Sequence, residues 1–194
     1  FHNGVLITMD DGQPQAQAIA IADDEILAVG ANKDILALAS DNTQIVDVQG
    51  HVLLPGFIDS HSHWIGDAVH TSPEMAIDSL VFNGWTSINE LFVNQQRLEE
   101  LLALDRSGKL RVRVNAYLPV NFTDEKFGNW YLEYEPMSYL TPHVRLAGIK
   151  LNLDHGWGTI FHWEQEELNN YVLEAHQNGW QVASHTVSQK AHDM

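Results

Sequence analysis

Three things are scarce in this sequence, and each scarcity narrows what the protein can be. There is no cysteine, so disulfides and thiolate ligands are excluded, and any metal must be held by histidine, carboxylate or a modified lysine. Lysine and arginine number 10 against 26 acidic residues, for a formal net charge of −16. This charge argues against nucleic acids and anionic membranes as partners, because both are bound through basic surfaces. No apolar run is long enough for a transmembrane helix.

What is present is a globular composition. The chain has 194 residues, 44% of them hydrophobic, and six tryptophans, which suits one good core or a small domain plus part of another. It begins with Phe1, so we expect the natural start to be missing. No signal peptide is recognisable, so we expect a cytoplasmic protein and leave export open. A homo-oligomer also stays open.

The sequence is organised around the run from Leu54 to Trp64, LPGFIDSHSHW. An apolar stretch meets a Pro-Gly break and continues as a short strand that carries His61 and His63. Side chains two apart on a strand point the same way, so both imidazoles can face one point, and Asp59 shares their parity. Imidazole is the commonest protein ligand for a transition metal. A bare His-x-His also arises by chance, as two polar residues leaving a strand for solvent.

Residues 1–53 read as short strands and carry no catalytic cluster. Asp23 and Asp24 predict a hairpin turn between two of these strands, and a short helix is expected over 31–39. The expected strands are 4–10, 16–22, 25–30 and two short ones within 44–53, around Gly50. We interpret this part as a small β-sandwich-like domain.

From residue 54 to 194, strands alternate with helices. Strands are expected within 54–64 and at 85–92, 110–120, 144–153 and 180–186, and helices at 72–83, 95–106, 164–178 and from 188 onward. Ser72 followed by Pro73 is a typical helix start. The alternation predicts an α/β fold with a parallel sheet and right-handed crossovers.

Two further stretches bear on the architecture. Within 110–120 the valines alternate with polar residues, so we expect the apolar set to face outer helices while Asn115 and Tyr117 face inward. Residues 121–143 are aromatic and without clear periodicity. They can cover a substrate or pack their own aromatic rings, and the sequence favours neither.

The run from Leu54 to Trp64 resembles the first barrel strand of the amidohydrolase superfamily, metal-dependent hydrolases on a (β/α)8 TIM barrel. The stretch AGIKLNLD, which contains Lys150, resembles the fourth strand, and VASH, which ends at His185, resembles the fifth. The resemblance implies that residues 54–194 hold about the first five β/α units of an incomplete barrel. It also implies that strands from the far C-terminus complete the small β-domain.

On a barrel, the carboxyl ends of these strands converge on one face. A protonated Lys150 cannot bind a metal, but a buried lysine loses its charge, and its neutral amine can react with CO2 to give an anionic carbamate. The resemblance implies that this carboxylated Lys150 bridges two metals, with His61, His63 and His185 as further ligands. The alternative is an ordinary lysine paired with Asp154 or Glu90.

Other residues are weaker candidates. A lone histidine on an apolar strand, such as His185, is more often a hydrogen-bonded core residue. His155 and Trp157 follow the fourth strand and are candidate substrate contacts, while Glu90 and Asn115 are candidates for supporting groups inside the barrel. Solvent or loop positions suffice for the remaining histidines of this part: His70, His143, His162, His176 and His192.

The closest branch of the resemblance is that of N-acyl amino-acid deacylase-like and imidazolonepropionase-related enzymes. This sequence departs from it where His155 intervenes after Asp154, and where Ser188 and Gln189 stand after the fifth strand. The family's second-metal histidine on strand six and its general base, an aspartate on strand eight, are expected beyond residue 194. The chain as it stands is therefore expected to be a poor catalyst.

The resulting hypothesis is a hydrolase of C–N bonds, of the amide type, that acts on a small-molecule substrate through hydroxide held by two divalent ions. Zinc is the default metal for a nitrogen and oxygen ligand set, with manganese or iron as alternatives. Two other functions stay open. One is a mononuclear deaminase in which Lys150 is not carboxylated, and the other is a non-catalytic barrel fragment with a partial metal site.

Overall fold

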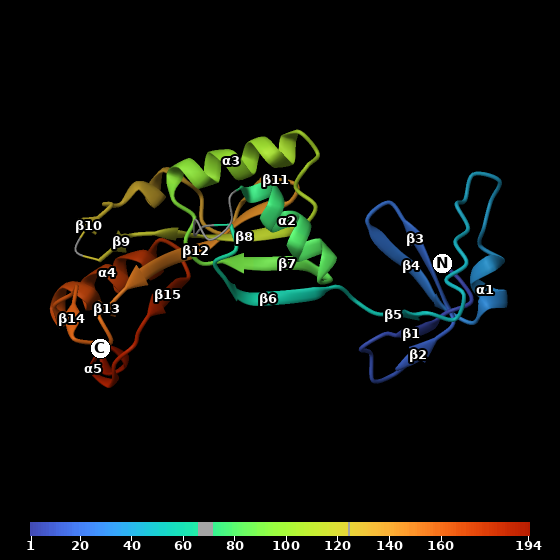
Figure 1. Cartoon of the computed structure of the whole chain (residues 1–194), viewed down its shortest axis with the longest axis horizontal. Helices are drawn as coiled ribbons and strands as arrows, with labels where there is room; N and C mark the ends of the chain where they lie inside the picture. The colour runs from blue at the N-terminus through green and yellow to red at the C-terminus, as the bar shows by residue number, and fades with distance from the viewer. Residues whose placement is uncertain (66–71, 124) are drawn as a thin grey trace. The chain divides into compact units, whose positions relative to one another are not determined.

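The computed structural model describes residues 1–65, 72–123 and 125–194. These residues form two compact units, Phe1–Gly56 and Phe57–Met194, drawn in Figure 1. Each unit is described by itself below. Among the described residues, no helix has the length and apolar character needed to cross a membrane.

The N-terminal unit is built from short strands. β1 (Val5–Ile7) pairs antiparallel with β2 (Gln15–Ala16) and parallel with β5 (Val52–Leu53). β3 (Ala18–Ala22) and β4 (Glu25–Gly30) form an antiparallel hairpin. Its turn falls at Asp23, which adopts a φ of 52°, so the predicted turn is confirmed. The short helix is α1 (Asn32–Leu36).

One predicted strand of this unit is wrong. Before Gly50 the structure has only an isolated parallel bridge between Asp47 and His2. The Asp47 carboxylate accepts hydrogen bonds from Gln49 N at 2.7 Å and from Asn3 Nδ2 at 3.0 Å. A side chain that binds its own backbone two residues on makes a turn, which competes with strand pairing.

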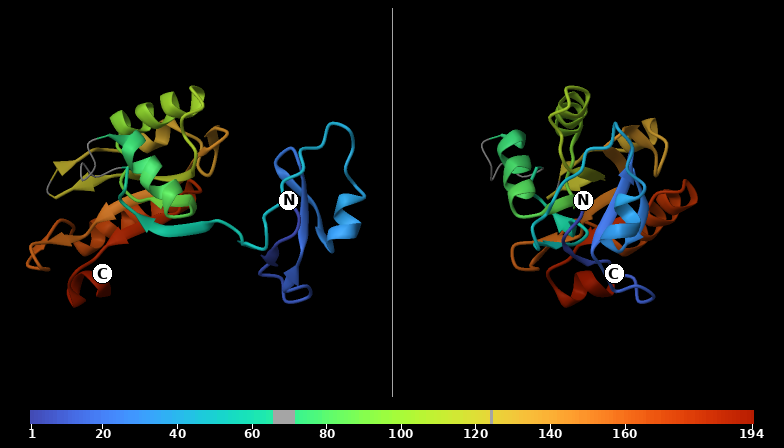
Figure 2. Two further views of the ribbon diagram at one scale, coloured as in Figure 1. Left: turned by 45° about the vertical axis from the view of Figure 1, so that its right-hand side comes forward. Right: turned by 90° about the vertical axis from the view of Figure 1, so that its right-hand side faces the viewer.

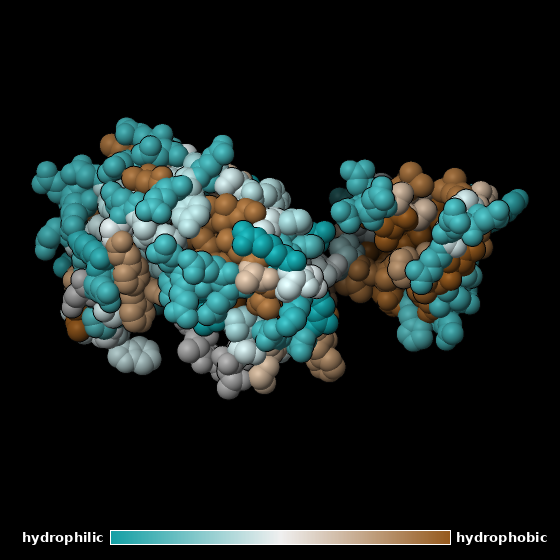
Figure 3. All heavy atoms as spheres, turned by 90° about the horizontal axis from the view of Figure 1, so that it is seen from above, coloured by the Kyte–Doolittle hydropathy of each residue, from teal (hydrophilic) through white to brown (hydrophobic). Residues whose placement is uncertain are grey.

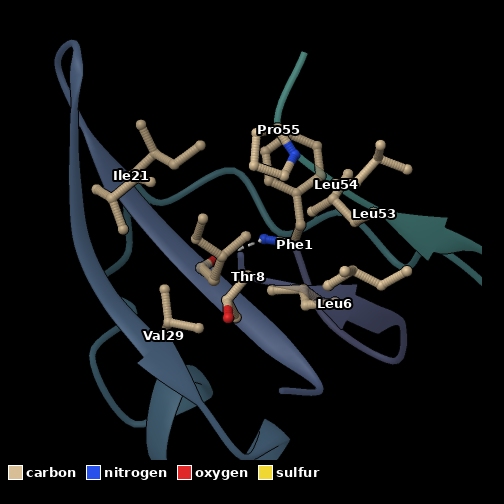
Figure 4. Close-up of a pocket in the computed structure, with 11 residues that line it drawn as sticks. Phe1, Leu6, Thr8, Ile21, Val29, Leu53, Leu54 and Pro55 are labelled. Atoms are coloured by element: carbon tan, nitrogen blue, oxygen red, sulfur yellow. Dashed lines mark hydrogen bonds between the residues drawn. The ribbon is translucent and has the colours of Figure 1, made fainter. Parts of the chain in front are cut away.

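The N-terminal unit leaves much apolar surface open. Hydrophobic residues gather over its face in Figure 3. Met9, Ile26 and Leu27 of this unit are all more than half exposed. A hollow of about 330 Å³ lies in the same unit. Figure 4 shows Phe1, Leu6, Ile21, Val29, Leu53 and Pro55 among its lining residues.

The C-terminal unit is a parallel sheet with helices in the connections. Its strands are β6 (Phe57–Ser62), β7 (Trp85–Glu90), β8 (Arg113–Pro119), β12 (Val144–Asn152) and β15 (Val182–His185). They lie side by side in chain order, each parallel to the next; Figure 2 gives two further views of the ribbon. The predicted strand-helix alternation and parallel sheet are confirmed.

The helices begin and end where the sequence marks them. They are α2 (Pro73–Phe82), α3 (Gln95–Arg106), α4 (Gln165–Gln177) and the short α5 (Gln189–Asp193). Ser72 Oγ caps α2 by accepting from Met75 N at 3.3 Å, and Asn94 caps α3 by accepting from Arg97 N at 2.9 Å. Glycines with positive φ follow both helices, at Gly84 and Gly108.

The two faces of β8 differ as predicted. Val114, Ala116 and Leu118 are buried in the main core, which includes residues of the helices. Tyr117 points to the other face, where it packs with Leu91 and Ala147 in a smaller cluster. That second face is the inner side of the sheet in a barrel.

The aromatic stretch at 121–143 packs its own rings. It holds β9 (Asn121–Phe122), β10 (Glu125–Lys126), a 3₁₀ turn η1 (Trp130–Glu133) and β11 (Tyr139–Thr141). Tyr131 is buried, with its ring centroid 5.4 Å from that of Trp180 and 6.2 Å from that of Tyr171 on α4. Within the stretch, the ring centroids of Trp130 and Tyr134 are 6.1 Å apart. These contacts favour the packing interpretation over substrate covering. β11, which the sequence did not predict, pairs antiparallel with the start of β12.

Candidate metal centre

The two histidines of the first strand lie next to each other. His61 is in β6 and His63 follows it directly, and their ring centroids are 5.4 Å apart. Asp59 accepts a hydrogen bond from His61 N at 3.0 Å through Oδ1, so this carboxylate holds the strand that carries the rings. The spacing of two therefore brings the imidazoles together, as the sequence indicates.

Lys150 lies near the carboxyl end of β12 with its side chain buried. It is 2% exposed, and among the described residues its Nζ has no hydrogen-bond partner. Burial lowers the pKa of Lys150, because desolvation disfavours the charged ammonium. The alternative interpretation, a lysine paired with Asp154 or Glu90, is therefore wrong.

His185 ends β15, the neighbouring strand, where it pairs in register with Asn152 of β12. Burial lowers the pKa of His61, and the charges of Lys150 and His185 lower it further against an opposing effect of Asp59. His61, Lys150 and His185 lie on β6, β12 and β15, three strands of one parallel sheet. Nearby cationic groups favour the neutral form of a histidine, and this is the form that binds metals.

These donors are not gathered into a preformed cage. Within the ranges 1–65, 72–123 and 125–194, no three histidines or carboxylates are grouped closely enough to hold a metal ion. His61, His63, Lys150 and His185 remain the predicted ligands. Imidazole nitrogens and a buried amine without a partner fit a divalent metal once the amine becomes an anionic oxygen ligand.

Glu90 and Asn115 support the strands around this end of the sheet. Glu90 is buried, and its Oε2 accepts from Ser62 Oγ at 3.0 Å and from Ile65 N at 3.2 Å. Those two residues flank His63, so Glu90 fastens the segment that carries it. Asn115 donates to Asn89 Oδ1 at 2.9 Å on the half-buried face.

The predicted substrate contacts lie on a hairpin after β12, formed by β13 (Asp154–His155) and β14 (Ile160–Phe161). Trp157 stands at its tip, 94% exposed. His155 is partly buried, and its Nδ1 lies 2.6 Å from His162 Nε2 with the rings parallel.

His162 lies in a loop, as predicted, but the hairpin folds it back into a buried place instead of leaving it in solvent. The sequence does contain a signal for this hairpin, because a Gly-Trp-Gly run lies between His155 and His162 and is typical of a turn. His176 and His192 are exposed, whereas His143 forms a hydrogen bond with Asp105 through Nδ1, at 2.7 Å from Oδ1. His70 lies outside the described residues.

Sequence reasoning also missed the role of Asp154. This carboxylate is 1% exposed and accepts from Val187 N at 2.8 Å, from Ser188 N at 2.9 Å and from Ser188 Oγ at 2.7 Å. Burial alone would raise the pKa of Asp154, but the hydrogen bonds from Ser188 and Val187 hold it below its ordinary value.

Known proteins resemble this chain in sequence over part of its length. No family model matches. The chain is 35% identical to the exoenzymes regulatory protein AepA of Pectobacterium carotovorum subsp. carotovorum over 63 residues, 32% of this chain and 14% of that protein. It is 33% identical to an N-substituted formamide deformylase of Arthrobacter pascens over 61 residues, 31% and 11% of the two chains. With imidazolonepropionase of Halobacterium salinarum it shares 42% identity over 48 residues, 24% and 12% of the two chains.

Solved structures resemble it over nearly its whole length. An uncharacterized metal-dependent hydrolase from Pyrococcus horikoshii OT3 superposes with a TM-score of 0.82 at 16% identity, over 99% of this chain and 65% of that one. Molinate hydrolase superposes with a TM-score of 0.65 at 14% identity, over 100% and 56%. The chain thus spans less than two thirds of either protein. At these identities the likeness shows the fold.

Proposed function

We propose that this chain, a partial (β/α) barrel related to the metal-dependent hydrolases of the amidohydrolase superfamily, carries the first half of a centre that hydrolyses an amide-type C–N bond. The observation that carries the proposal is the amine of Lys150, which is buried without a hydrogen-bond partner among the described residues. Its strand, β12, pairs directly with β15, the strand that ends at His185. Burying an amine without a partner costs free energy. Titratable groups buried in this way cluster at functional sites. We take the five parallel strands as the first five units of the barrel.

In this proposal, Lys150 is converted into a ligand before the centre assembles. Its neutral amine attacks CO2, an N–C bond forms while one C=O π bond breaks and gives its electron pair to oxygen, and one proton leaves the nitrogen for solvent, which leaves an anionic carbamate. The carbamate oxygens and the imidazoles of His61, His63 and His185 would hold the metal, zinc by default and manganese or iron as alternatives. A divalent metal supplies a nucleophile from water at neutral pH and polarises a carbonyl.

The other assigned residues orient the metal ligands or contact the substrate. Glu90, through Ser62 and Ile65, keeps the segment around His63 in place. We assign His155 and Trp157 to substrate contact, since their hairpin follows the strand of Lys150 directly. The general base and a further histidine ligand belong to later barrel strands in the family, so turnover is proposed for a protein that contains those strands together with this chain.

The sequence comparison with known proteins supports a small organic substrate. One relative is named for removing formyl groups from N-substituted formamides, and its reaction breaks a C–N bond. The surplus of acidic residues, 26 against 10 basic ones, supports neither nucleic acids nor anionic membranes as ligands.

Two measurements test the proposal. Growth with ¹³C-labelled bicarbonate should give a carbamate signal in the ¹³C spectrum of the chain, and Lys150→Ala should lack it. A protein that carries this chain and the remaining strands should release amine and acid from N-acyl or N-formyl amines, and His61→Ala should abolish that release. Ammonia release from an aminopurine without a carbamate would instead favour the deaminase, and unchanged hydrolysis in His61→Ala would exclude the assigned site.

A further inference from the structure

The loop after the fifth strand is tied to the end of the fourth by one carboxylate. Asp154 Oδ1 accepts from Val187 N, and Asp154 Oδ2 accepts from both the backbone and the hydroxyl of Ser188, all within 2.9 Å. Val187 and Ser188 come two and three residues after His185. Hydrogen bonds from N–H and O–H groups to an ionised carboxylate are roughly twice as strong as neutral ones.

His185 is therefore held from both sides by the same segment. Its carbonyl oxygen accepts from Leu153 N at 3.0 Å, and the residues that follow it bind Asp154. The pairing of β15 with β12 holds the residues before His185, so the backbone is fastened before and after the side chain. Ser188 Oγ also accepts from Ala191 N at 3.2 Å and caps α5. The hydrogen bonds that fix this loop therefore continue into the helix.

A close approach of the two loops supports the same arrangement. A Cβ added to Gly158, in the turn of the β13–β14 hairpin, would lie 2.4 Å from Ser188 Cβ. Real Cβ atoms do not approach that closely, so this turn packs directly on the loop that Asp154 binds.

We propose that Asp154 is a positioning residue for His185: it fixes the backbone beyond β15 so that the imidazole meets the metal in a single orientation. The inference rests on the proposed metal centre. Asp154 is not assigned as a ligand, because both of its oxygens already accept hydrogen bonds from the loop. Groups that orient a metal ligand typically contribute about 10- to 100-fold to metal affinity.

The test compares Asp154→Asn with Asp105→Asn. An amide keeps one acceptor oxygen and turns an NH2 group toward N–H donors, so Asp154→Asn loses at least one of the three bonds. Asp105 is a matched control. It is also buried, and it accepts from His143 N at 2.9 Å with the His143 ring Nδ1 at 2.7 Å. His143 directly precedes β12, so this carboxylate lies at the opposite end of the strand from Lys150.

Zn²⁺ affinity by chelator competition and the visible spectrum of the Co²⁺ form are the readouts, on the whole 194-residue chain. Asp154→Asn should bind Zn²⁺ about 10- to 100-fold more weakly and shift the Co²⁺ bands, while Asp105→Asn should keep both values of the parent. Should Asp154→Asn fail to fold, Ser188→Ala, which removes only the hydroxyl bond, should give a smaller loss in the same direction.

Parent-like affinity and spectrum in Asp154→Asn, or in a folded Ser188→Ala when Asp154→Asn does not fold, would overturn the inference and leave the metal centre standing. Equal losses in Asp154→Asn and Asp105→Asn would also overturn it, because the effect would then be general instability. Failure of the parent chain to bind either metal would instead overturn the proposed function.

Discussion

Glu90 and Ser62 face each other across the first two strands of the sheet, and the Ser62 hydroxyl donates to Glu90 Oε2 at 3.0 Å. Ser62 lies between His61 and His63 in sequence, so its side chain points to the opposite face of the strand from the two imidazoles. The bond ties the strand that carries both predicted ligands to its neighbour. Both partners are buried, which makes this contact costly to break.

The first prediction follows from that bond. Ser62→Ala should lower the free energy of unfolding by about 1–3 kcal/mol, because a buried carboxylate loses a donor. Urea denaturation measures the change. Ser60→Ala, on the same strand but exposed, is the control and should stay within about 0.5 kcal/mol of the parent. Equal stability of Ser62→Ala and the parent would mean that the contact does not hold the strand.

The second prediction concerns Lys150. Replacing it with methionine, which has a similar length and no polar group, should raise the stability of the metal-free chain by about 1–3 kcal/mol, because the cost of burying an unpartnered amine disappears. The same variant should lose metal binding. Thermal and urea unfolding in the presence of a chelator measure the first effect. A destabilised Lys150→Met would show that the amine has a stabilising partner.

The third prediction is a pH dependence at Asp105. Burial would raise the pKa of this carboxyl, but the Thr141 hydroxyl and the backbone and ring of His143 lower it overall. A depressed pKa in the folded state stabilises the protein above the unfolded pKa, about 3.9, and this stabilisation is lost as the pH falls through the folded value.

Asp105→Asn should therefore be less stable than the parent by about 1–3 kcal/mol at about pH 7, with the difference closing toward about pH 3. Urea denaturation at several pH values gives the curve. Asp41→Asn, an exposed position, should show no comparable difference. A stability difference between Asp105→Asn and the parent that grows as the pH falls would contradict the lowered pKa of Asp105.

The fourth prediction tests the inner face of the sheet. A Cβ on Gly148 would lie 2.6 Å from both the Gln181 carbonyl oxygen and the Tyr117 ring. Gly148→Ala should therefore cost about 1–3 kcal/mol and displace Tyr117, seen by denaturation and by the ring signals in NMR. Gly12→Ala, whose nearest neighbour is the Asp10 carboxylate at 3.3 Å, should cost less. A neutral Gly148→Ala would mean that β12 and Tyr117 are further apart.

Local signals account for the parts of the fold that sequence could predict. The Ser72 cap, the Asn94 cap and the glycines that end the helices act within a few residues, so α2 and α3 begin and end where the sequence marks them. The alternation in β8 separates a core face from an inner face by the same short-range rule.

The features that sequence did not predict depend on contacts between distant segments. β11 is a strand only because the start of β12 offers it a free edge. His162 is buried because a hairpin returns it to His155. The Asp154 carboxylate was visible as part of a pattern around Lys150, but its partners, 33 and 34 residues further on, were not.

The positions of the four predicted ligands illustrate the same limit. Spacing places His61 beside His63, and the strand order places Lys150 and His185 on neighbouring strands. Neither spacing nor strand order reports how closely the donor atoms converge, which depends on side-chain rotamers and on whatever binds between them.

The most direct measurement is metal content by elemental analysis, on the chain produced without chelators, beside His61→Ala/His63→Ala and a His176→Ala/His192→Ala control made at two exposed histidines. The account predicts about one to two equivalents of zinc, manganese or iron in the parent and in the control, and none in the His61/His63 variant. Equal metal in all three proteins, or none in the parent, would contradict a metal centre at the carboxyl ends of these strands.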